Sequence, residues 1–377
     1  MVYTQLKLKN LSKLLAFGLI SFIPHASAAI VLQKISVLTG LEYESNPAFN
    51  SSNKRSVWRA TALPTYTASL VEERNRWFTT AGLSVQRSSD SAVSESRQDP
   101  NLLVGWEHEY ERGTFNIIAD YSKTSSRLNE FTSNGVVDQD GSATTKSISA
   151  SWTRLLTERL NLSAQGQYSQ INYAGSGLSN YKSKSLNTSL TYELNERVSP
   201  FVQIGISELN SELNNTQSRF SKSLLVGATA MLRPNLNMSA SAGVNHRQGS
   251  GVGLVANVSM SYLAERYNLQ GNLSRNVTPS GIGEFQQTNN LNVRYVYDLS
   301  DKSKIGSDFA WSSNNSAGSN GSAGGNNTLQ AGGWYSRELS ESLQFRVNLN
   351  RKQLSNAVQS ANSNIVGISL NYNTPDF

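Results

Sequence analysis

The amino-acid sequence predicts an all-β fold: a transmembrane antiparallel up-and-down β-barrel of about 18 strands, with both termini in the periplasm. Three observations predict it. Apolar residues occupy every second position along many short stretches, the connections between these stretches alternate in length, and aromatic residues gather beside the short connections. The chain of 377 residues contains no Cys, which excludes disulfide scaffolds, thiolate metal sites and thiol nucleophiles.

Residues 1–28 have the three parts of a signal peptide. Lys7, Lys9 and Lys13 form the basic part, residues 14–23 are apolar, and Ala26-Ser27-Ala28 is a small-residue cleavage site. The apolar part has ten residues, fewer than the roughly 20 that a spanning helix needs. We therefore expect a signal peptide at 1–28 and a single barrel domain at 29–377. Removal of the peptide leaves 30 basic and 27 acidic residues, a formal net charge of +3 that gives no support to nucleic-acid binding.

Strand-like alternation begins shortly after the signal peptide and continues to the C-terminus. The first strand is weakly marked, Pro64 interrupts the second, and Pro200 lies in the ninth. The intervening positions are dominated by Asn, Ser, Gln and Thr, so one face of each strand is expected to contact lipid and the other water. The weak first stretch contains Ile35, Val37, Leu41 and Tyr43. In chain order, the clear stretches contain Trp77, Ala81, Leu83, Val85; Leu102, Val104, Trp106; Phe115, Ile117, Ala119, Tyr121; Ile148, Ala150, Trp152; Leu186, Leu190, Tyr192; Leu224, Val226, Ala228; Leu236, Met238, Ala240, Ala242, Val244; Leu254, Ala256, Val258, Met260; Leu291, Val293, Tyr295, Tyr297; Leu343, Phe345, Val347, Leu349; and Val366, Ile368, Leu370, Tyr372.

The connections alternate between short turns and long loops rich in Ser, Asn and Gly. This repeating hairpin of about 39 residues is typical of outer-membrane barrels, whose short turns are periplasmic and whose long loops are extracellular. The short turns are residues 72–75, 111–113, 157–159, 195–197, 233–235, 264–266, 300–302 and 338–341, and the long loops are residues 44–54, 86–100, 122–144, 169–183, 208–218, 276–287 and 312–327.

Aromatic residues concentrate at the strand ends next to the short turns, as in the interfacial girdle of a membrane barrel. The alternative is that these are ordinary core aromatics of a soluble β-sandwich. In lipid an open sheet edge would leave amide groups unpaired, so the sheet must close, and at this strand number we expect an aqueous channel inside. The C-terminal Phe377 resembles the outer-membrane assembly signal, which makes the barrel assembly machinery and outer-membrane lipid the expected partners.

Polar residues in the water-facing phase are the candidate pore-lining residues. Their amide groups can exchange hydrogen bonds with carbohydrate hydroxyls, but any hydrophilic pore needs a polar wall, and both interpretations stay open. They are Arg59, Asn161, Gln165, Gln167, Asn268, Gln270, Asn272, Arg294, Arg346 and Lys352.

The loop at residues 122–144 is the longest and the third of the long loops, the position that folds inward as a constriction in general porins. Glu130, Asp138 and Asp140 are its candidate constriction residues. Asp138, Asp140 and Gly141 match part of a calcium-loop pattern, but the closing glutamate is missing, so we expect no metal. No motif for a nucleophile, a zinc site or a phosphate loop occurs, and we expect neither an enzyme nor a cofactor.

The segment Gly40-Leu41-Glu42-Tyr43-Glu44-Ser45-Asn46-Pro47, followed by polar-faced strands without a plug domain, resembles outer-membrane β-barrel porins found beside exopolysaccharide biosynthesis genes. The resemblance implies a polysaccharide substrate and a periplasmic polysaccharide-export protein as a partner. The sequence therefore predicts a channel of the bacterial outer membrane, first as the exit pore for an exopolysaccharide. The alternative is a general diffusion porin for small hydrophilic solutes, and a weaker one is a surface adhesin or structural barrel.

Overall fold

A computed structural model of the protein describes residues 29–131, 140–214, 218–316, 325–356 and 360–375. Eighteen strands form a single sheet, accompanied by the short helix α2 (Ser126–Glu130) and the 3-10 turn η2 (Glu212–Asn214). The strands are β1 (Ile30–Glu44), β2 (Val57–Glu72), β3 (Asn75–Ser88), β4 (Arg97–Tyr110), β5 (Gly113–Ser125), β6 (Ser142–Thr157), β7 (Leu160–Ala174), β8 (Tyr181–Tyr192), β9 (Val198–Ser211), β10 (Arg219–Arg233), β11 (Leu236–Arg247), β12 (Gly251–Leu263), β13 (Tyr267–Pro279), β14 (Phe285–Ser300), β15 (Ser303–Ser316), β16 (Asn326–Glu338), β17 (Leu343–Ser355) and β18 (Ser360–Asn373).

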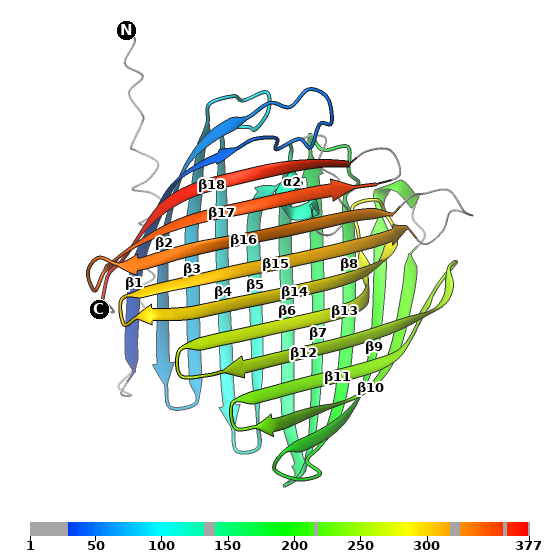
Figure 1. The fold of residues 1–377 in the computed structure, drawn as a ribbon. Helices are drawn as coiled ribbons and strands as arrows, with labels where there is room; N and C mark the ends of the chain where they lie inside the picture. The colour runs from blue at the N-terminus through cyan, green and yellow to red at the C-terminus, as the bar shows by residue number, and fades with distance from the viewer. Residues whose placement is uncertain (1–28, 132–139, 215–217, 317–324, 357–359, 376–377) are drawn as a thin grey trace.

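Each strand pairs antiparallel with its neighbours in sequence, and β1 also pairs with β18, which closes the sheet into a barrel (Figure 1). The closing seam runs from Ser36 opposite Asn373 to Glu44 opposite Ile365. Closure pairs the edge amides that lipid could not satisfy. The predicted up-and-down barrel of eighteen strands is therefore confirmed, and the sandwich alternative, which needs two packed sheets, is wrong.

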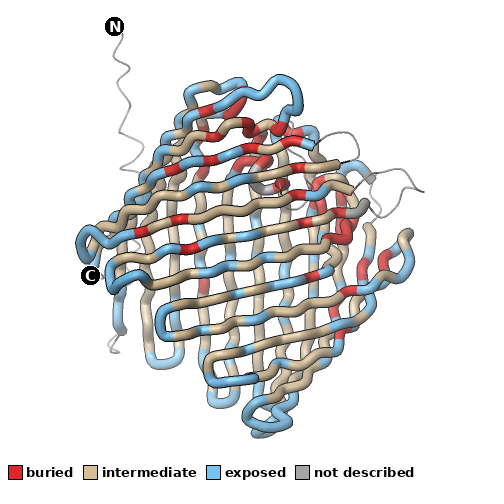
Figure 2. Tube along the Cα trace, viewed as in Figure 1, coloured by how far each residue is buried: buried red, intermediate tan, exposed pale blue. Residues whose placement is uncertain are grey.

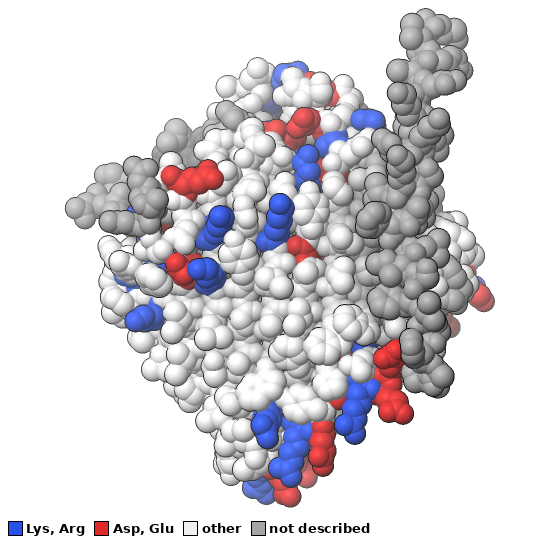
Figure 3. Space-filling view, turned by 180° about the vertical axis from the view of Figure 1, so that it is seen from behind, with Lys and Arg blue, Asp and Glu red and all other residues white. Residues whose placement is uncertain are grey.

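The two faces of the wall differ as the alternation predicts. On β9, for example, Val202, Ile204 and Ile206 are exposed on the outside, whereas Leu209 points inward and is buried. Figure 3 shows the same division on the outer surface, where charged side chains lie toward the two ends and an uncharged belt lies between them. Rings meet beside the short turns, with Trp77 stacked on Trp106 at a centroid distance of 5.6 Å. These features match the predicted apolar belt and aromatic girdle.

Several strands extend further into the long loops than the sequence predicts. β7 continues to Ala174 and β8 starts at Tyr181, inside the predicted loop at 169–183, and β13 and β14 shorten the loop at 276–287 in the same way. The polar side chains in these segments hide the strand period, while the backbone ladder continues beyond the apolar belt. Among the described residues, no helix is long and apolar enough to cross a membrane.

Buried side chains gather toward the long-loop end (Figure 2). One apolar cluster contains Phe49, Phe131, Leu354 and Ala361, and a second is built around Tyr181, Leu209 and Phe285. A barrel of this size has no continuous core, so a packed interior at one end requires chain that enters the lumen. Two segments supply it, and both belong to the candidate site.

Candidate pore constriction

The loop after β5 folds into the barrel as α2 and is tied at its base. The backbone N–H of Ser126 donates to the carbonyl of Gly141 at 3.0 Å, and the Ser126 hydroxyl accepts from the Gly141 N–H at 3.1 Å. Asp140 accepts from the Ser125 hydroxyl at 2.8 Å and from the Glu95 N–H at 2.9 Å. These bonds hold the two ends of the segment together against the β3–β4 loop.

The side chains of α2 continue this attachment into the lumen. The Arg127 guanidinium donates to the carbonyl of Val93 at 2.8 Å, and both residues are buried. A guanidinium taken from water needs such acceptors, since an unsatisfied buried donor costs about 1–3 kcal/mol. The helix has five residues, too few to be stable alone, so its position depends on these tertiary contacts.

Two consecutive residues at the end of α2 contact nearly opposite walls. Glu130 accepts a hydrogen bond from the Tyr173 hydroxyl of β7. Phe131 packs with Leu354 of β17 and stacks on Phe49 at a centroid distance of 5.2 Å. Around the ring of strands, β7 and β17 are eight steps apart in one direction and ten in the other. The α2 segment therefore crosses the lumen.

Phe49, in the β1–β2 loop, has a φ of 53°, in the left-handed region that a bulky residue rarely adopts. It is nevertheless almost completely buried against Phe131. The packing of the two rings and the bond from its N–H to the Asn46 carbonyl at 3.1 Å hold this backbone conformation. The first long loop thus supports the third one.

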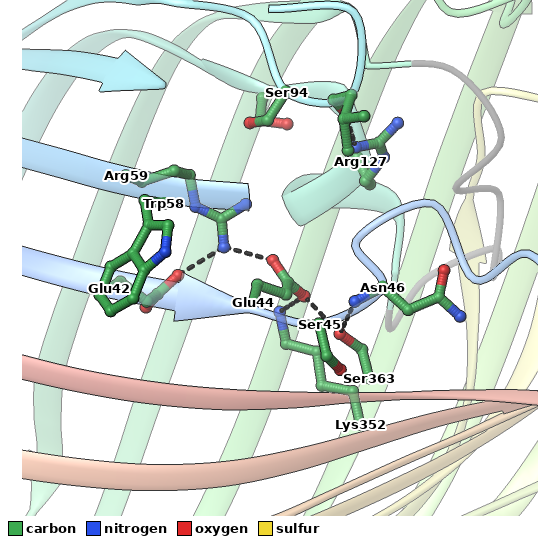
Figure 4. A network of polar contacts seen from close by, with 12 residues as sticks. Glu42, Glu44, Ser45, Asn46, Trp58, Arg59, Ser94, Arg127, Lys352 and Ser363 are labelled. Carbon is green, nitrogen blue, oxygen red and sulfur yellow. Dashed lines mark hydrogen bonds and ion pairs between the residues drawn. The ribbon is translucent and has the colours of Figure 1, made fainter. Parts of the chain in front are cut away.

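A charge network surrounds this support at the closing seam (Figure 4). The buried Glu44 carboxylate at the end of β1 forms ion pairs with Arg59 of β2 and with Lys352 of β17, the latter at 3.6 Å. Arg59 also pairs with the more exposed Glu42. The Ser363 hydroxyl of β18 donates to Glu44 at 3.2 Å. Two carboxylates thus offset two cations, and the network joins the first two strands to the last two.

A second segment, the tip of the β13–β14 hairpin, leaves the wall. The β12–β13 ladder ends where Ala256 pairs with Arg275, although β12 begins at Gly251 and β13 continues to Pro279. Beyond that point the side-chain amide of Gln287, on β14, donates a hydrogen bond to the main-chain carbonyl of Leu254, on β12, at 3.0 Å. The amide and the Arg247 guanidinium both approach the inner side of Gly253. The tip therefore lies inside the barrel.

The hairpin tip reaches across to β7, β8, β9 and β10. Phe285 packs against the inward-facing Tyr181 and Leu209. Glu284 pairs with Arg219 at the start of β10, with the guanidinium and carboxylate 2.9 Å apart. The carbonyl of Gly281 accepts from the Ser179 N–H at 2.8 Å. A Cβ at position 281 would lie 3.1 Å from the Tyr173 ring, so a glycine permits this close approach.

The two inward segments meet at Tyr173, which bonds to Glu130 of the first and contacts Gly281 of the second. Each of them contributes to one of the two buried apolar clusters of the barrel. Among the described residues no group of three metal-binding side chains occurs, and Asp140 is occupied by its protein donors.

Comparisons with known proteins bear on the fold. No family model matches the chain, and no curated protein matches it. Among solved structures, OccK3 (OpdO) of Pseudomonas aeruginosa is 9% identical, with 91% of this chain and 95% of that chain covered and a TM-score of 0.51. OccAB4 of Acinetobacter baumannii is 9% identical, with 92% and 98% covered and a TM-score of 0.50. A mutant of the ferric enterobactin receptor PfeA of Pseudomonas aeruginosa is 8% identical, with 93% and 81% covered and a TM-score of 0.52.

These proteins share the barrel fold with this chain, at identities that establish the fold alone. A closed antiparallel barrel with an apolar outer belt is the fold typical of proteins that span the bacterial outer membrane. The protein is a bacterial outer-membrane β-barrel.

Within this outer-membrane barrel, the predicted site residues fall into two groups. Glu130 is the last residue of α2, Arg59, Asp140 and Lys352 lie beside this helix, and Asp138 lies outside the described residues. The α2 part of the third loop thus lies inside the barrel, and its role as a pore constriction stays a prediction. The predicted pore-lining role of Arg59 and Lys352 stays a prediction, and their charges are balanced by Glu42 and Glu44.

The other predicted residues lie toward the short-turn end. Asn268, Gln270 and Arg294 line a recess between β12 and β15 together with Asp298 and Lys304. Arg294 lies 3.7 Å from Asp308, and Arg346 lies over the Trp334 ring at 4.2 Å. Asn272 of β13 pairs with Asn292, and the β7 residues Asn161, Gln165 and Gln167 share the face of Tyr173. Their role in solute passage stays a prediction.

Sequence reasoning missed the residues that hold the constriction together. Tyr173, Phe49 and the β13–β14 tip lie in segments that read as loops. The segment at residues 40–47 carries the resemblance, and in the structure its last residues tie the first loop to β18. The Ser45 N–H donates to the Asn364 carbonyl at 3.0 Å, and the Asn46 amide donates to the Asn362 carbonyl at 3.1 Å.

Proposed function

We propose that the protein is a diffusion channel for small hydrophilic solutes, in which the α2 segment and the β13–β14 tip set the size of the passage. The observation that carries the proposal is the crossing of the lumen by Glu130 and Phe131 between β7 and β17. The polar inner wall at the short-turn end supports it, because amide and charged side chains replace the hydration of a passing solute.

A narrow passage follows from this arrangement. Two packed segments near one end leave a solute less room than the open barrel would, while the rest of the wall stays wide. A polymer chain would have to displace both segments from the lumen. It would have to do so while the buried ion pairs of Glu44 with Arg59 and Lys352 still hold the first loop, which supports α2, in place. This favours small solutes over a continuous polysaccharide strand.

Polysaccharide export, the first function predicted from the sequence, has less support. Within its motif at residues 40–47, Ser45 and Asn46 make structural contacts with β18. The polar amides of the inner wall suit a carbohydrate and equally suit any hydrated solute. The surface adhesin or structural barrel is the third candidate, and it predicts no conductance at all.

Planar-bilayer recording tests the proposal. The wild-type protein is expected to give small conductance steps, and removal of residues 130–140 is expected to enlarge them severalfold. Liposome swelling should show entry of a monosaccharide and exclusion of a dextran, with both admitted by the deletion variant. If the two proteins have equal conductance, the inward segments do not constrict the passage. If neither protein gives any conductance, the proposed channel function is wrong. Specific block by an anionic exopolysaccharide would favour the export pore instead.

A further inference from the structure

Five lysines lie on the outer face of the wall, near the long-loop ends of β5, β6, β8 and β10. Residues two apart on a strand share a face. Each of these lysines is two residues from an outward-facing apolar or aromatic residue or from another lysine of the group, so all five face outward. Lys146 follows this rule with Ile148, and Lys222 follows it with Leu224. The five, here called the lysine band, are Lys123, Lys146, Lys182, Lys184 and Lys222.

The strand register spreads the lysine band over six neighbouring strands, β5 to β10, with Lys222 separated from Lys184 by Ile206 and Glu208 of β9. Tyr121 pairs with Lys146, Lys146 pairs with Gln170, and Gln170 pairs with Lys182. Adjacent strands lie about 4.8 Å apart, so these side chains are close neighbours across the wall. Figure 3 shows Lys and Arg side chains above the uncharged belt on this side of the barrel. The ammonium groups therefore stand where the apolar belt ends.

Little negative charge offsets the lysine band. Among the described strand residues, Glu208 is its one acidic neighbour by register, and it pairs with Lys184 at 3.3 Å. No ion pair between described residues includes Lys123, Lys146, Lys182 or Lys222. On the other strands the outward positions at this level include Ser313, Asn327 and Asn364, with three scattered cations, Arg87 on β3, Arg275 on β13 and Arg351 on β17. The positive charge is thus concentrated on one arc.

The lysine band lies directly above an apolar belt. This arrangement fits an amphiphile whose anionic groups lie at the height of the lysines and whose acyl chains lie at the height of the belt. Lysine stems can lie along acyl chains while their ammonium groups reach the headgroup layer. Phosphate is a strong acceptor for such ammonium groups. The uncharged belt below the band supplies the apolar contact.

We propose that the lysine band binds the phosphate groups of a phosphorylated glycolipid in the outer leaflet, with the acyl chains against the belt below. The proposal requires that the long loops face outward. It does not depend on channel activity, because the lysine band lies on the opposite face of the wall from the lumen.

The test measures binding of lipid A to the full-length mature protein in detergent, by native mass spectrometry and by titration. Lipid A with both phosphates and lipid A without phosphates are compared. Each lysine near a charged headgroup changes the affinity by about fivefold, so a triple variant Lys146→Gln, Lys182→Gln, Lys222→Gln is expected to bind roughly a hundredfold more weakly. The matched control is Arg159→Gln, Arg197→Gln, Arg233→Gln, which removes three exposed cations at the short-turn end.

The expected result is tight binding of phosphorylated lipid A by the wild type and the control, and weak binding by the lysine variant. Equal binding of both lipids by the wild type would overturn the proposal, and this comparison needs no variant that must fold. An equal loss in the control would also overturn it, as would displacement of the lipid by millimolar inorganic phosphate, which indicates a site for free phosphate. Bilayer conductance measured on the same samples reports on the channel separately.

Discussion

Tyr173 of β7 donates a hydrogen bond to the Glu130 carboxylate at the end of α2, and its ring lies against Gly281 of the β13–β14 tip. One wall residue thus contacts both segments that enter the barrel. The two segments come from loops about 150 residues apart in the chain, which makes this junction the point where their positions are coupled. Loss of the junction should affect both.

We expect Tyr173→Phe to increase the conductance or the open time of the channel. The substitution keeps the ring and removes the hydroxyl, and a hydrogen bond to a charged group such as the Glu130 carboxylate contributes about 1.5–3 kcal/mol. A change of this size alters the ratio of packed to displaced α2 by about fivefold or more. Single-channel recording checks it. The control is Tyr168→Phe on the outer face of the same strand, and indistinguishable traces from the two variants would contradict the junction.

Glu44→Gln should destabilise the barrel strongly. Glu44 is 3% exposed and faces two cations, and removing one member of a buried charge network typically costs about 3–5 kcal/mol. The matched variant Glu42→Gln removes a carboxylate that also pairs with Arg59 but is more than a third exposed, so it should cost about 1 kcal/mol or less. The temperature at which the folded barrel loses its fast electrophoretic mobility measures both. A drop of equal size in the two variants would show that the burial of Glu44 carries no extra weight.

The alternation of apolar and polar residues was enough to predict the strands of the barrel wall. The loop sequences were not enough to predict that α2 and the β13–β14 tip pack inside it. Alternation fixes which side of each strand faces lipid, because the side-chain period of a strand is two. The contact of Tyr173 with Gly281 depends instead on how far a polar hairpin bends inward, and no local pattern encodes that bend. Glu130 was predicted from loop length and position, whereas its partner on β7 was hidden inside a segment read as loop.

The fate of the charged pore-lining candidates shows the same limit. Arg59 and Lys352 were predicted from the water-facing phase to line the pore, and that role stays a prediction, while the register pairs Arg59 with Glu42. The pair of Arg59 with Glu44 lies within the β1–β2 hairpin, whereas the pair of Lys352 with Glu44 depends on the closing of β1 on β18, strands more than 300 residues apart. Phase can be predicted from one strand, but ion pairs across a closing seam cannot.

Glu284→Arg should loosen the β13–β14 tip and raise conductance. It replaces the ion pair with Arg219 by a like-charge contact, and both side chains are about one-third exposed, so an effect of up to about 1 kcal/mol is expected. The double variant Arg219→Glu, Glu284→Arg restores opposite charges and should restore the wild-type trace. Recordings in 0.1 M and 1 M KCl check it, since salt screens a partly exposed pair. Failure of the double variant to recover would argue that Glu284 acts through packing.

Arg294→Gln should shift the ion selectivity of the channel toward cations. Arg294 lines the recess at the short-turn end, where Asp298 and Asp308 would be left with less opposing charge. Charged side chains along a pore bias the ions that enter it, so the reversal potential under a tenfold KCl gradient should move by several millivolts in the direction of K⁺. The control Arg351→Gln removes an exposed guanidinium from the outer face of β17 and should leave the reversal potential unchanged. Equal shifts in both variants would mean that the effect is one of overall charge, and no shift in either would place Arg294 outside the path of the ions.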